Sequence, residues 1–198
     1  MLTVHQIDAE EGIPLGLLRA SARSPRRRWK RAVLVLALVV TLFAAATARL
    51  FVWPARGVPR HADAIVLFNG HGNRLDEALA LAYTHVAPNL VISRGTPTAT
   101  NPCSPPISGV TVTCFSPDPG TTQGEAEFVG RLAAKYQWHS LLLITTRAQD
   151  SRARLRMERC FGGRVDVATV HLPNHEWPRT IAYEWAALFK AFVVQRHC

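Results

Sequence analysis

Residues 63–74 read DAIVLFNGHGNR, and this stretch indicates the fold. Within it, the continuous apolar run Ala64–Phe68 is typical of a strand buried on both faces of a parallel sheet. The polar and glycine residues Asn69–Asn73 then predict a turn. Arg74 begins a helical segment whose apolar residues share one face: Leu75, Ala78, Leu79 and Ala82. A buried strand, a turn and a helix in this order predict the first unit of an alternating α/β fold.

The same alternation continues toward the C-terminus. We expect further strands at Leu90–Ile92, Ser140–Thr146 and Val165–Val170, and a short one within Val110–Phe115. We expect helices at Arg74–Val86, Thr122–Tyr136, Asp150–Cys160 and Pro178–Val194. Residues 63–198 are therefore predicted to form one α/β domain, a Rossmann-like parallel sheet with helices on both faces. Residues 96–120, rich in Pro, Thr and Ser, predict a long loop, and long loops in compact domains are usually functional.

Ligands of such sheets bind beyond the carboxyl ends of the strands, so polar residues there are candidates for a binding site. The candidates are Asn69, Gly70, Arg74, Ser93, Thr121, Thr122, Thr146 and Arg152. Glycine lets the backbone approach a ligand closely, and the N-terminus of the following helix favours an anion. We therefore predict a site for an anionic ligand at this edge.

Two arginines are the strongest candidates. A cation at a helix start opposes the helix dipole, so Arg74 suits a site that receives an anion. The alternative is an ion pair of Arg74 with Asp76, Glu77 or another surface carboxylate. Arg152 lies one turn from a predicted strand end and is the second candidate. Three further arginines are expected to form a solvated basic face: Arg154, Arg156 and Arg159.

Glu125 and His71 are the candidates for a general base. Glu125 also lies three residues after Thr122, which is the spacing of a helix capping box, so a structural role is the alternative. A loop histidine such as His71 is more often a surface residue. Whether the chain is an enzyme stays open.

Motifs that would name a metal or cofactor are missing from the sequence. There is no HExxH, GxSxG or Walker motif, and Gly70-His71-Gly72 lacks the third glycine of a dinucleotide fingerprint. His171 and His175 are four residues apart, but Pro173 interrupts the helix that would align them. We predict no metal and assign no cofactor.

A second informative stretch precedes the domain. Residues 32–53 read AVLVLALVVTLFAAATARLFVW, and only Arg49 interrupts their apolar run. A helix rises about 1.5 Å per residue, so a run of this length crosses a hydrocarbon core of roughly 30 Å. We predict one transmembrane anchor at residues 32–53. The alternative is a cleaved signal peptide, with Ala46–Ala48 as its small-x-small site.

Basic residues are concentrated before this run. Arg23, Arg26, Arg27, Arg28, Lys30 and Arg31 precede it, whereas Arg56 and Arg60 follow it. This bias places the N-terminus in the cytoplasm and residues 63–198 outside the plasma membrane, in both alternatives. Residues 1–31 are expected to form a disordered basic leader, and residues 54–62 a linker.

The net charge of +9 does not indicate nucleic-acid binding. Seven basic and three acidic residues precede the apolar run, and fifteen basic and eleven acidic residues follow it, so each part carries +4 and Arg49 supplies the rest. The leader charge is explained by membrane topology. The predicted partners are therefore the lipid bilayer and an anionic small-molecule or lipid-linked ligand, and not nucleic acid.

All four cysteines, Cys103, Cys114, Cys160 and Cys198, follow the apolar run. An even number of cysteines in an exported domain predicts two disulfides. We favour Cys103–Cys114, which closes the long loop, and Cys160–Cys198, which ties the C-terminus to a helix end. Four free buried thiols are the alternative, and the lack of CxxC spacing argues against zinc.

Four segments together resemble the DUF218 family, also called the YdcF-like or SanA/ElyC-like family. They are DAIVLFNGHGNRLDEAL, LVISRG, CFSPDPGTTQGEAE and LLLITTRAQDSRARLRMERCFGG, within about residues 63–190. The third segment and the Arg-Cys ending are most similar to an actinobacterial branch with a single N-terminal anchor. The chain departs from the family pattern at Gln149, where the family has histidine, and at Arg94, where it has glycine. The resemblance implies a Rossmann-like fold and a role in the cell envelope, without fixing a reaction.

The sequence thus predicts a membrane-anchored, extracytoplasmic domain that binds an anionic envelope ligand. A phosphate or pyrophosphate of a lipid-linked sugar is the expected class, because Arg74 and Arg152 would flank it. One alternative is a hydrolase or transferase acting on lipid-linked envelope precursors, with Glu125 or His71 as its base. Another is a non-catalytic scaffold that recruits envelope proteins through residues 96–120.

Overall fold

The computed structural model of the chain describes residues 25–54, 57–70, 72–94, 103 and 106–198. The chain divides into two compact units, one ending at Leu42 and one running from Phe43 to Cys198, which are described separately. The candidate base His71, most of the predicted leader, and residues 96–102 and 104–105 of the predicted loop lie outside the described residues.

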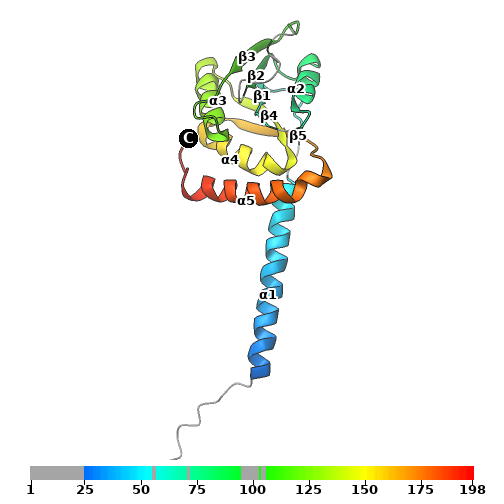
Figure 1. The fold of residues 1–198 in the computed structure, drawn as a ribbon. Coiled ribbons are helices and arrows are strands. Elements are labelled where there is room, and N and C mark those ends of the chain that lie inside the picture. The colour runs from blue at the N-terminus through cyan, green and yellow to red at the C-terminus, as the bar shows by residue number, and fades with distance from the viewer. Residues whose placement is uncertain (1–24, 55–56, 71, 95–102, 104–105) are drawn as a thin grey trace, which may run out of the picture. The chain divides into compact units, whose positions relative to one another are not determined.

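Five parallel strands form the sheet of the second unit, in the order β3-β2-β1-β4-β5 (Figure 1). They are β1 Ala64–Leu67, β2 Asn89–Ser93, β3 Thr111–Phe115, β4 Ser140–Thr146 and β5 Arg164–Val170. β1 is central, since Ile65 lies beside Leu90 of β2 and beside Leu142 of β4. The predicted parallel sheet is confirmed, and the short strand expected within residues 110–115 is its edge strand.

Helices cover both faces of this sheet, as predicted (Figure 1). Successive residues of a strand point to opposite faces, so Ile65 packs in the core under α2 (Arg74–Tyr83), while Val66 packs in the core under α3 (Thr122–Tyr136) and α4 (Asp150–Cys160). The chain adds β2 and β3 on one side of β1, then crosses to add β4 and β5 on the other. The strand order therefore reverses between β1 and β4.

Two helices differ in their bounds from the sequence prediction. α2 ends at Tyr83 rather than at the predicted Val86, and His85 has a left-handed φ of 55° that α-helix does not allow. The last helix, α5, spans Trp177–Val193 and follows a 3₁₀ turn at residues 174–176. α5 packs mainly against α4, outside the two layers that cover the sheet (Figure 1).

The N-terminal helix α1 spans Pro25–Thr47 and continues as a π-helical turn at Ala48–Val52. Residues Arg26–Val52 are long and apolar enough to cross a membrane, and no other helix within the described ranges meets that test. This helix fits the predicted single-pass anchor. Within the second unit its end is held in place, because Phe51 is fully buried and the Leu50 carbonyl accepts a hydrogen bond of 2.6 Å from Ser151 Oγ.

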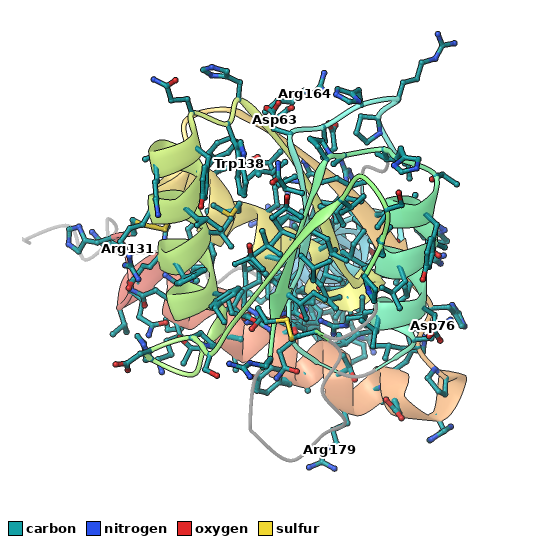
Figure 2. The ribbon with its side chains drawn as sticks, turned by 90° about the horizontal axis from the view of Figure 1, so that it is seen from above. Asp63, Asp76, Arg131, Trp138, Arg164 and Arg179 are labelled. Carbon is teal, nitrogen blue, oxygen red and sulfur yellow. A yellow bond between two sulfur atoms is a disulfide. The ribbon has the colours of Figure 1, made fainter. Side chains whose placement is uncertain are left out.

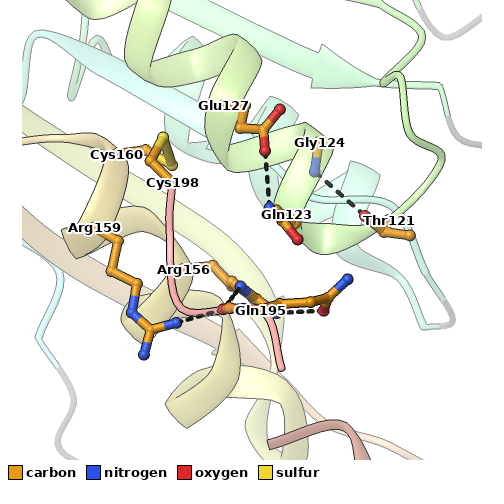
Figure 3. The surroundings of a disulfide bond; sticks show 9 residues. All are labelled: Thr121, Gln123, Gly124, Glu127, Arg156, Arg159, Cys160, Gln195 and Cys198. Atoms are coloured by element: carbon orange, nitrogen blue, oxygen red, sulfur yellow. Dashed lines mark hydrogen bonds between the residues drawn. A yellow bond between two sulfur atoms is a disulfide. The ribbon is translucent and has the colours of Figure 1, made fainter. Parts of the chain in front are cut away.

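Both predicted disulfides are present, Cys103–Cys114 and Cys160–Cys198. Near the second bridge, two arginines of α4 hold the chain after α5 (Figure 3). Arg156 and Arg159 each donate a hydrogen bond to the Gln195 carbonyl, at 2.6 and 2.8 Å. The solvated basic face expected from the sequence is therefore wrong for Arg156, which is 3% exposed. Its guanidinium instead binds the backbone carbonyl and the side-chain oxygen of Gln195, just after α5.

The amino ends of the central strands are joined by one carboxylate. Asp63 Oδ2 accepts hydrogen bonds from the amides of His139 and Ser140, at 2.7 and 2.8 Å, and from Ser140 Oγ at 2.9 Å. Asp63 and Arg179 lie at opposite ends of the domain in Figure 2. The contact fixes β1 beside β4 at the end of the sheet away from the site described next.

Candidate functional site

A cavity of about 760 Å³ opens at the carboxyl edge of the sheet, where β1 and β4 lie side by side. Its walls come from the turn after β1, the first residues of α2 and α3, the turn between β4 and α4, and the first turns of α5. In a parallel sheet the point where strand order reverses is the place where the loops diverge and leave room for a ligand. The cavity therefore lies where the sequence predicted a site.

Arg74 lies in the wall of this cavity and is 5% exposed. Its Nη1 donates to the carbonyls of Phe68 and Asn69, at 3.2 and 3.1 Å, and its Nη2 donates to Thr146 Oγ1 at 3.3 Å. These acceptors fix the guanidinium in position. Burial lowers the pKa of Arg74 to about 10, although the negative charges of Glu125 and Glu184, which also act on it, by themselves raise it. An anion in the cavity would stabilise the charged form.

Gly70 permits this position of Arg74. Gly70 has a φ of +148°, which L side chains rarely adopt, and an added Cβ would lie 2.5 Å from Arg74 Nη2. The guanidinium therefore lies directly over the backbone of the turn after β1. Any side chain at this position would displace it.

Glu125 projects from the first turn of α3 toward the turn after β1. Its Oε1 accepts a hydrogen bond of 2.6 Å from the Asn69 amide. The capping-box alternative is thus not realised: Thr121 caps α3 by accepting from the Gly124 amide at 3.3 Å, and the Glu125 carboxylate turns into the cavity wall. Burial raises the pKa of Glu125, although the Asn69 amide and the positive charge of Arg74 partly oppose the shift. Such a carboxyl group is suited to proton transfer.

Arg152 forms a bidentate ion pair with Glu184 of α5. Its Nε and Nη2 donate to the two carboxylate oxygens at 2.7 and 2.8 Å. Burial by itself lowers the pKa of Arg152, but the hydrogen bonds and charge of Glu184 outweigh burial and raise it. Arg152 Nη1 also donates to Thr122 Oγ1, which accepts a second hydrogen bond from Gln149 at 3.3 Å. The pair thereby connects α4, α5 and the start of α3 around one wall of the cavity.

The formal charges of the side chains that line the cavity sum to zero, so the position of each charge decides which ligand is favoured. Among the described residues, three arginines and three glutamates line the cavity: Arg74, Arg152, Arg179, Glu125, Glu176 and Glu184. Arg152 and Glu184 neutralise each other, and the helices α2, α3 and α5 all begin at this edge. The partial positive charges of helix N-termini add to that of Arg74. An anion beside Arg74 would therefore meet these positive charges and also the Glu125 carboxyl group in the first turn of α3, so it is accommodated best when Glu125 is protonated.

The structure brings together seven of the eight predicted ligand-binding residues in the cavity wall: Asn69, Gly70, Arg74, Thr121, Thr122, Thr146 and Arg152. The eighth, Ser93, is buried outside the lining. Its hydroxyl lies near enough to Glu125 to favour the ionised carboxylate, although the geometry falls short of an ordinary hydrogen bond. Ser93 therefore supports the wall rather than forming it.

Sequence reasoning missed the residues that α5 contributes. Glu184, Arg179 and Tyr183 line the cavity, and none of them was a candidate. One signal was present, because Glu184 shares a helix face with the buried Leu188 and Ala191. An acidic residue on a buried face requires a partner, which is Arg152. Gln149, noted only as a departure from the family pattern, is also buried in the wall.

No metal site is evident among the residues that the structure describes, since no group of three potential ligands lies together there. His175 is in the cavity wall, whereas His171 is not. No family model, no curated protein and no solved structure matches this chain. The fold and the site define a Rossmann-like α/β domain with a polar cavity at its strand-order reversal, preceded by one helix able to span a membrane.

Proposed function

We propose that this protein is a membrane-anchored, extracytoplasmic domain that binds a phosphate-bearing ligand of the cell envelope. The observation that carries the proposal is Arg74, a buried guanidinium that hydrogen bonds hold in the wall of the cavity. A phosphate oxygen beside it would gain charge-assisted hydrogen bonds and the field of the α3 N-terminus. The resemblance to the DUF218 family supports the cell-envelope part of the proposal.

The proposed topology has two supports. The basic residues before the apolar helix exceed those after it, which favours a cytoplasmic N-terminus. Two disulfides in the domain that follows suit an oxidising compartment. The anchor would keep the cavity within reach of ligands that are themselves membrane-bound.

The test is a binding measurement on the full chain in detergent micelles. Pyrophosphate, a nucleotide sugar and a polyprenyl phosphate are titrated separately by calorimetry against the wild type and Arg74→Ala. Hydrogen bonds to charged groups contribute about 1.5–3 kcal/mol, so Arg74→Ala should weaken binding by about 10- to 100-fold. The three ligands separate recognition of phosphate alone from recognition of a sugar or a lipid.

Arg131→Ala is the matched control, because Arg131 is an exposed arginine of α3 that points away from the domain in Figure 2. Arg74→Lys keeps the positive charge and tests whether the guanidinium geometry matters. Equal affinities of the wild type and Arg74→Ala would contradict the proposal. So would a lack of binding to all three ligands, which would favour a non-catalytic scaffold instead.

A second candidate, a hydrolase or transferase acting on the same ligand, is favoured by Glu125. This carboxyl group is buried in the cavity wall beside two arginines, and burial raises its pKa, as a general acid or base requires. Turnover of a lipid-linked pyrophosphate that is lost in Glu125→Gln, with ligand affinity retained, would establish catalysis. Binding without turnover would leave the protein a binding domain.

A further inference from the structure

One face of α5 is apolar and exposed. Ala182, Ala186, Phe189 and Val193 are spaced four, three and four residues apart, so they share this face. Phe189 and Val193 are 66% and 46% exposed. From Trp53 onward, nine large apolar side chains are exposed in the described residues, and five of these lie on α5 or directly after it. A cluster of this kind marks an interaction surface.

The opposite face of α5 packs against the rest of the domain. Glu184, Leu188 and Ala191 are buried against the rest of the domain. The exposed apolar face is therefore additional to the one that folding requires. It also has a basic border, since Arg179 and Lys190 are exposed and the single glutamate within α5 is buried. An apolar face bordered by cations is typical of a helix that lies in the headgroup region of a bilayer.

The end of the membrane-spanning helix touches α5 beside this face. Phe43 stacks on Trp185 with ring centroids 5.2 Å apart, and Trp185 Nε1 donates to Thr47 Oγ1 at 3.1 Å. Phe51 meets the same indole edge-on at 5.3 Å. Trp185 is thus held by three residues of one helix end, all within the second unit.

This contact sets the depth of α5. Phe43 belongs to the uncharged run that ends at Ala48, so it is expected inside the hydrocarbon, roughly 9 Å from Arg49 along the helix axis. Trp185, in contact with Phe43 and Thr47, then lies at the boundary between acyl chains and headgroups, which is the position tryptophan favours. A helix held at that depth presents its exposed apolar face to lipid.

We infer that α5 is a second membrane element, an interfacial helix whose Phe189 and Val193 face is immersed in the leaflet next to the domain. The inference rests on the membrane-spanning helix and is independent of any ligand in the cavity. The position of α5 also affects how a ligand reaches the cavity, because Arg179, Thr180 and Tyr183 of α5 line it. In this arrangement one wall of the cavity belongs to a helix at the lipid surface, so a lipid-borne phosphate would have a short path to it.

The test is the depth of nitroxide labels on the full chain in bilayer nanodiscs. All four native cysteines are in disulfides, so Phe189→Cys and Val193→Cys each provide one reactive thiol. Tyr83→Cys and Tyr136→Cys are matched controls on α2 and α3, where the tyrosines are 58% and 55% exposed. Collisions of each label with oxygen, which partitions into lipid, are compared with collisions with a water-soluble nickel chelate.

Labels at positions 189 and 193 should collide several-fold more with oxygen relative to nickel than the labels at positions 83 and 136. Equal ratios at all four positions would overturn the inference. Low collision rates with both reagents, together with dipolar broadening between labels, would show that a second copy of the chain covers α5, and that result would overturn it too.

Discussion

Arg152 of α4 and Glu184 of α5 form the ion pair that closes one wall of the cavity, with contacts of 2.7 and 2.8 Å and side chains that are 11% and 4% exposed. Because α5 lies outside the layers that cover the sheet, this pair is a polar connection between the cavity and the outermost helix. If this ion pair breaks, the cavity wall loses the link between α4 and α5.

Removing one partner of this pair should be strongly destabilising. In Glu184→Ala the guanidinium of Arg152 remains buried without its counter-charge, which costs about 3–5 kcal/mol of unfolding free energy. The double variant Arg152→Met/Glu184→Leu should recover most of that loss, and urea unfolding of the full chain in detergent measures both. Glu158→Ala, which removes an exposed carboxylate of α4, is the control and should change stability by less than about 0.5 kcal/mol. A double variant that is no more stable than Glu184→Ala would contradict the coupling.

Gly70→Ala should weaken phosphate binding while leaving the fold intact. The added methyl group would lie 2.5 Å from Arg74 Nη2, so the guanidinium must move out of its position. We expect affinity for pyrophosphate to fall about tenfold, equivalent to about 1.4 kcal/mol. Gly57→Ala is the control, since nothing lies within 4 Å of a Cβ there. Unchanged affinity in Gly70→Ala would show that the position of Arg74 does not matter to the ligand.

Glu125 should contribute more to stability in acid than at neutral pH. Burial raises its pKa in the folded state above the ordinary 4.5, so the folded state binds the proton more tightly than the unfolded state. Its contribution to the unfolding free energy is complete below pH 4.5 and is lost as the pH rises through the folded-state pKa. The stability difference between the wild type and Glu125→Gln should therefore fall with rising pH over that window. A difference that stays flat or rises would refute the assigned shift.

Asp63 should have the opposite pH dependence. Burial by itself raises its pKa, but the hydrogen bonds from His139 and Ser140 outweigh burial and leave it below the ordinary 3.8. Its contribution is therefore complete above pH 3.8 and is lost as the pH falls through the lower folded-state pKa. Asp63→Asn should abolish this loss of unfolding free energy at low pH. Asp76→Asn, which removes an exposed carboxylate of α2, should not. Identical acid titrations of the wild type and Asp63→Asn would count against the role of these hydrogen bonds.

The two disulfides should stabilise the domain unequally. Their cysteines are 38 and 11 residues apart, and the chain-entropy model gives about 4 kcal/mol for Cys160–Cys198 and about 3 kcal/mol for Cys103–Cys114. Cys160→Ser/Cys198→Ser should also release the chain that Arg156 and Arg159 hold, and so increase the difference. Urea unfolding of each double variant measures the loss. A larger loss on removing Cys103–Cys114 would contradict this order.

The sheet was predictable because each strand has a recognisable apolar run in the sequence. Apolar runs such as Ala64–Phe68 and Ser140–Thr146 can be buried only in the middle of an α/β domain, and turn residues separate them from helices of the right period. The end of α2 was not predictable, since a left-handed residue such as His85 has no unique sequence signature. Helix ends are commonly decided by such single-residue geometry.

The site was predictable where it follows the strands and not where it depends on packing. Arg74, Thr122 and Thr146 lie at strand or helix ends, and the topology alone gathers them at one edge. Glu184 reaches the cavity only because α5 folds back over α4, which no local pattern specifies. For the same reason Arg156 was expected in solvent, although the chain after α5 covers it.

The central position of β1 has a consequence for the order of folding during synthesis. One edge of β1 pairs with β2 as soon as Leu90 has emerged, but its other edge pairs with Leu141, 77 residues after Ala64. Until then the most apolar strand of the chain carries an open ladder of amides and carbonyls, which is an aggregation hazard for a nascent protein. Closing such a distant parallel contact is slow because the loop entropy must be lost first. The contact between β1 and β4 therefore forms only after β4 has emerged, and β5 is added to β4 later still. The cavity at the end of this contact forms only when the domain is complete, because α5 supplies part of its wall.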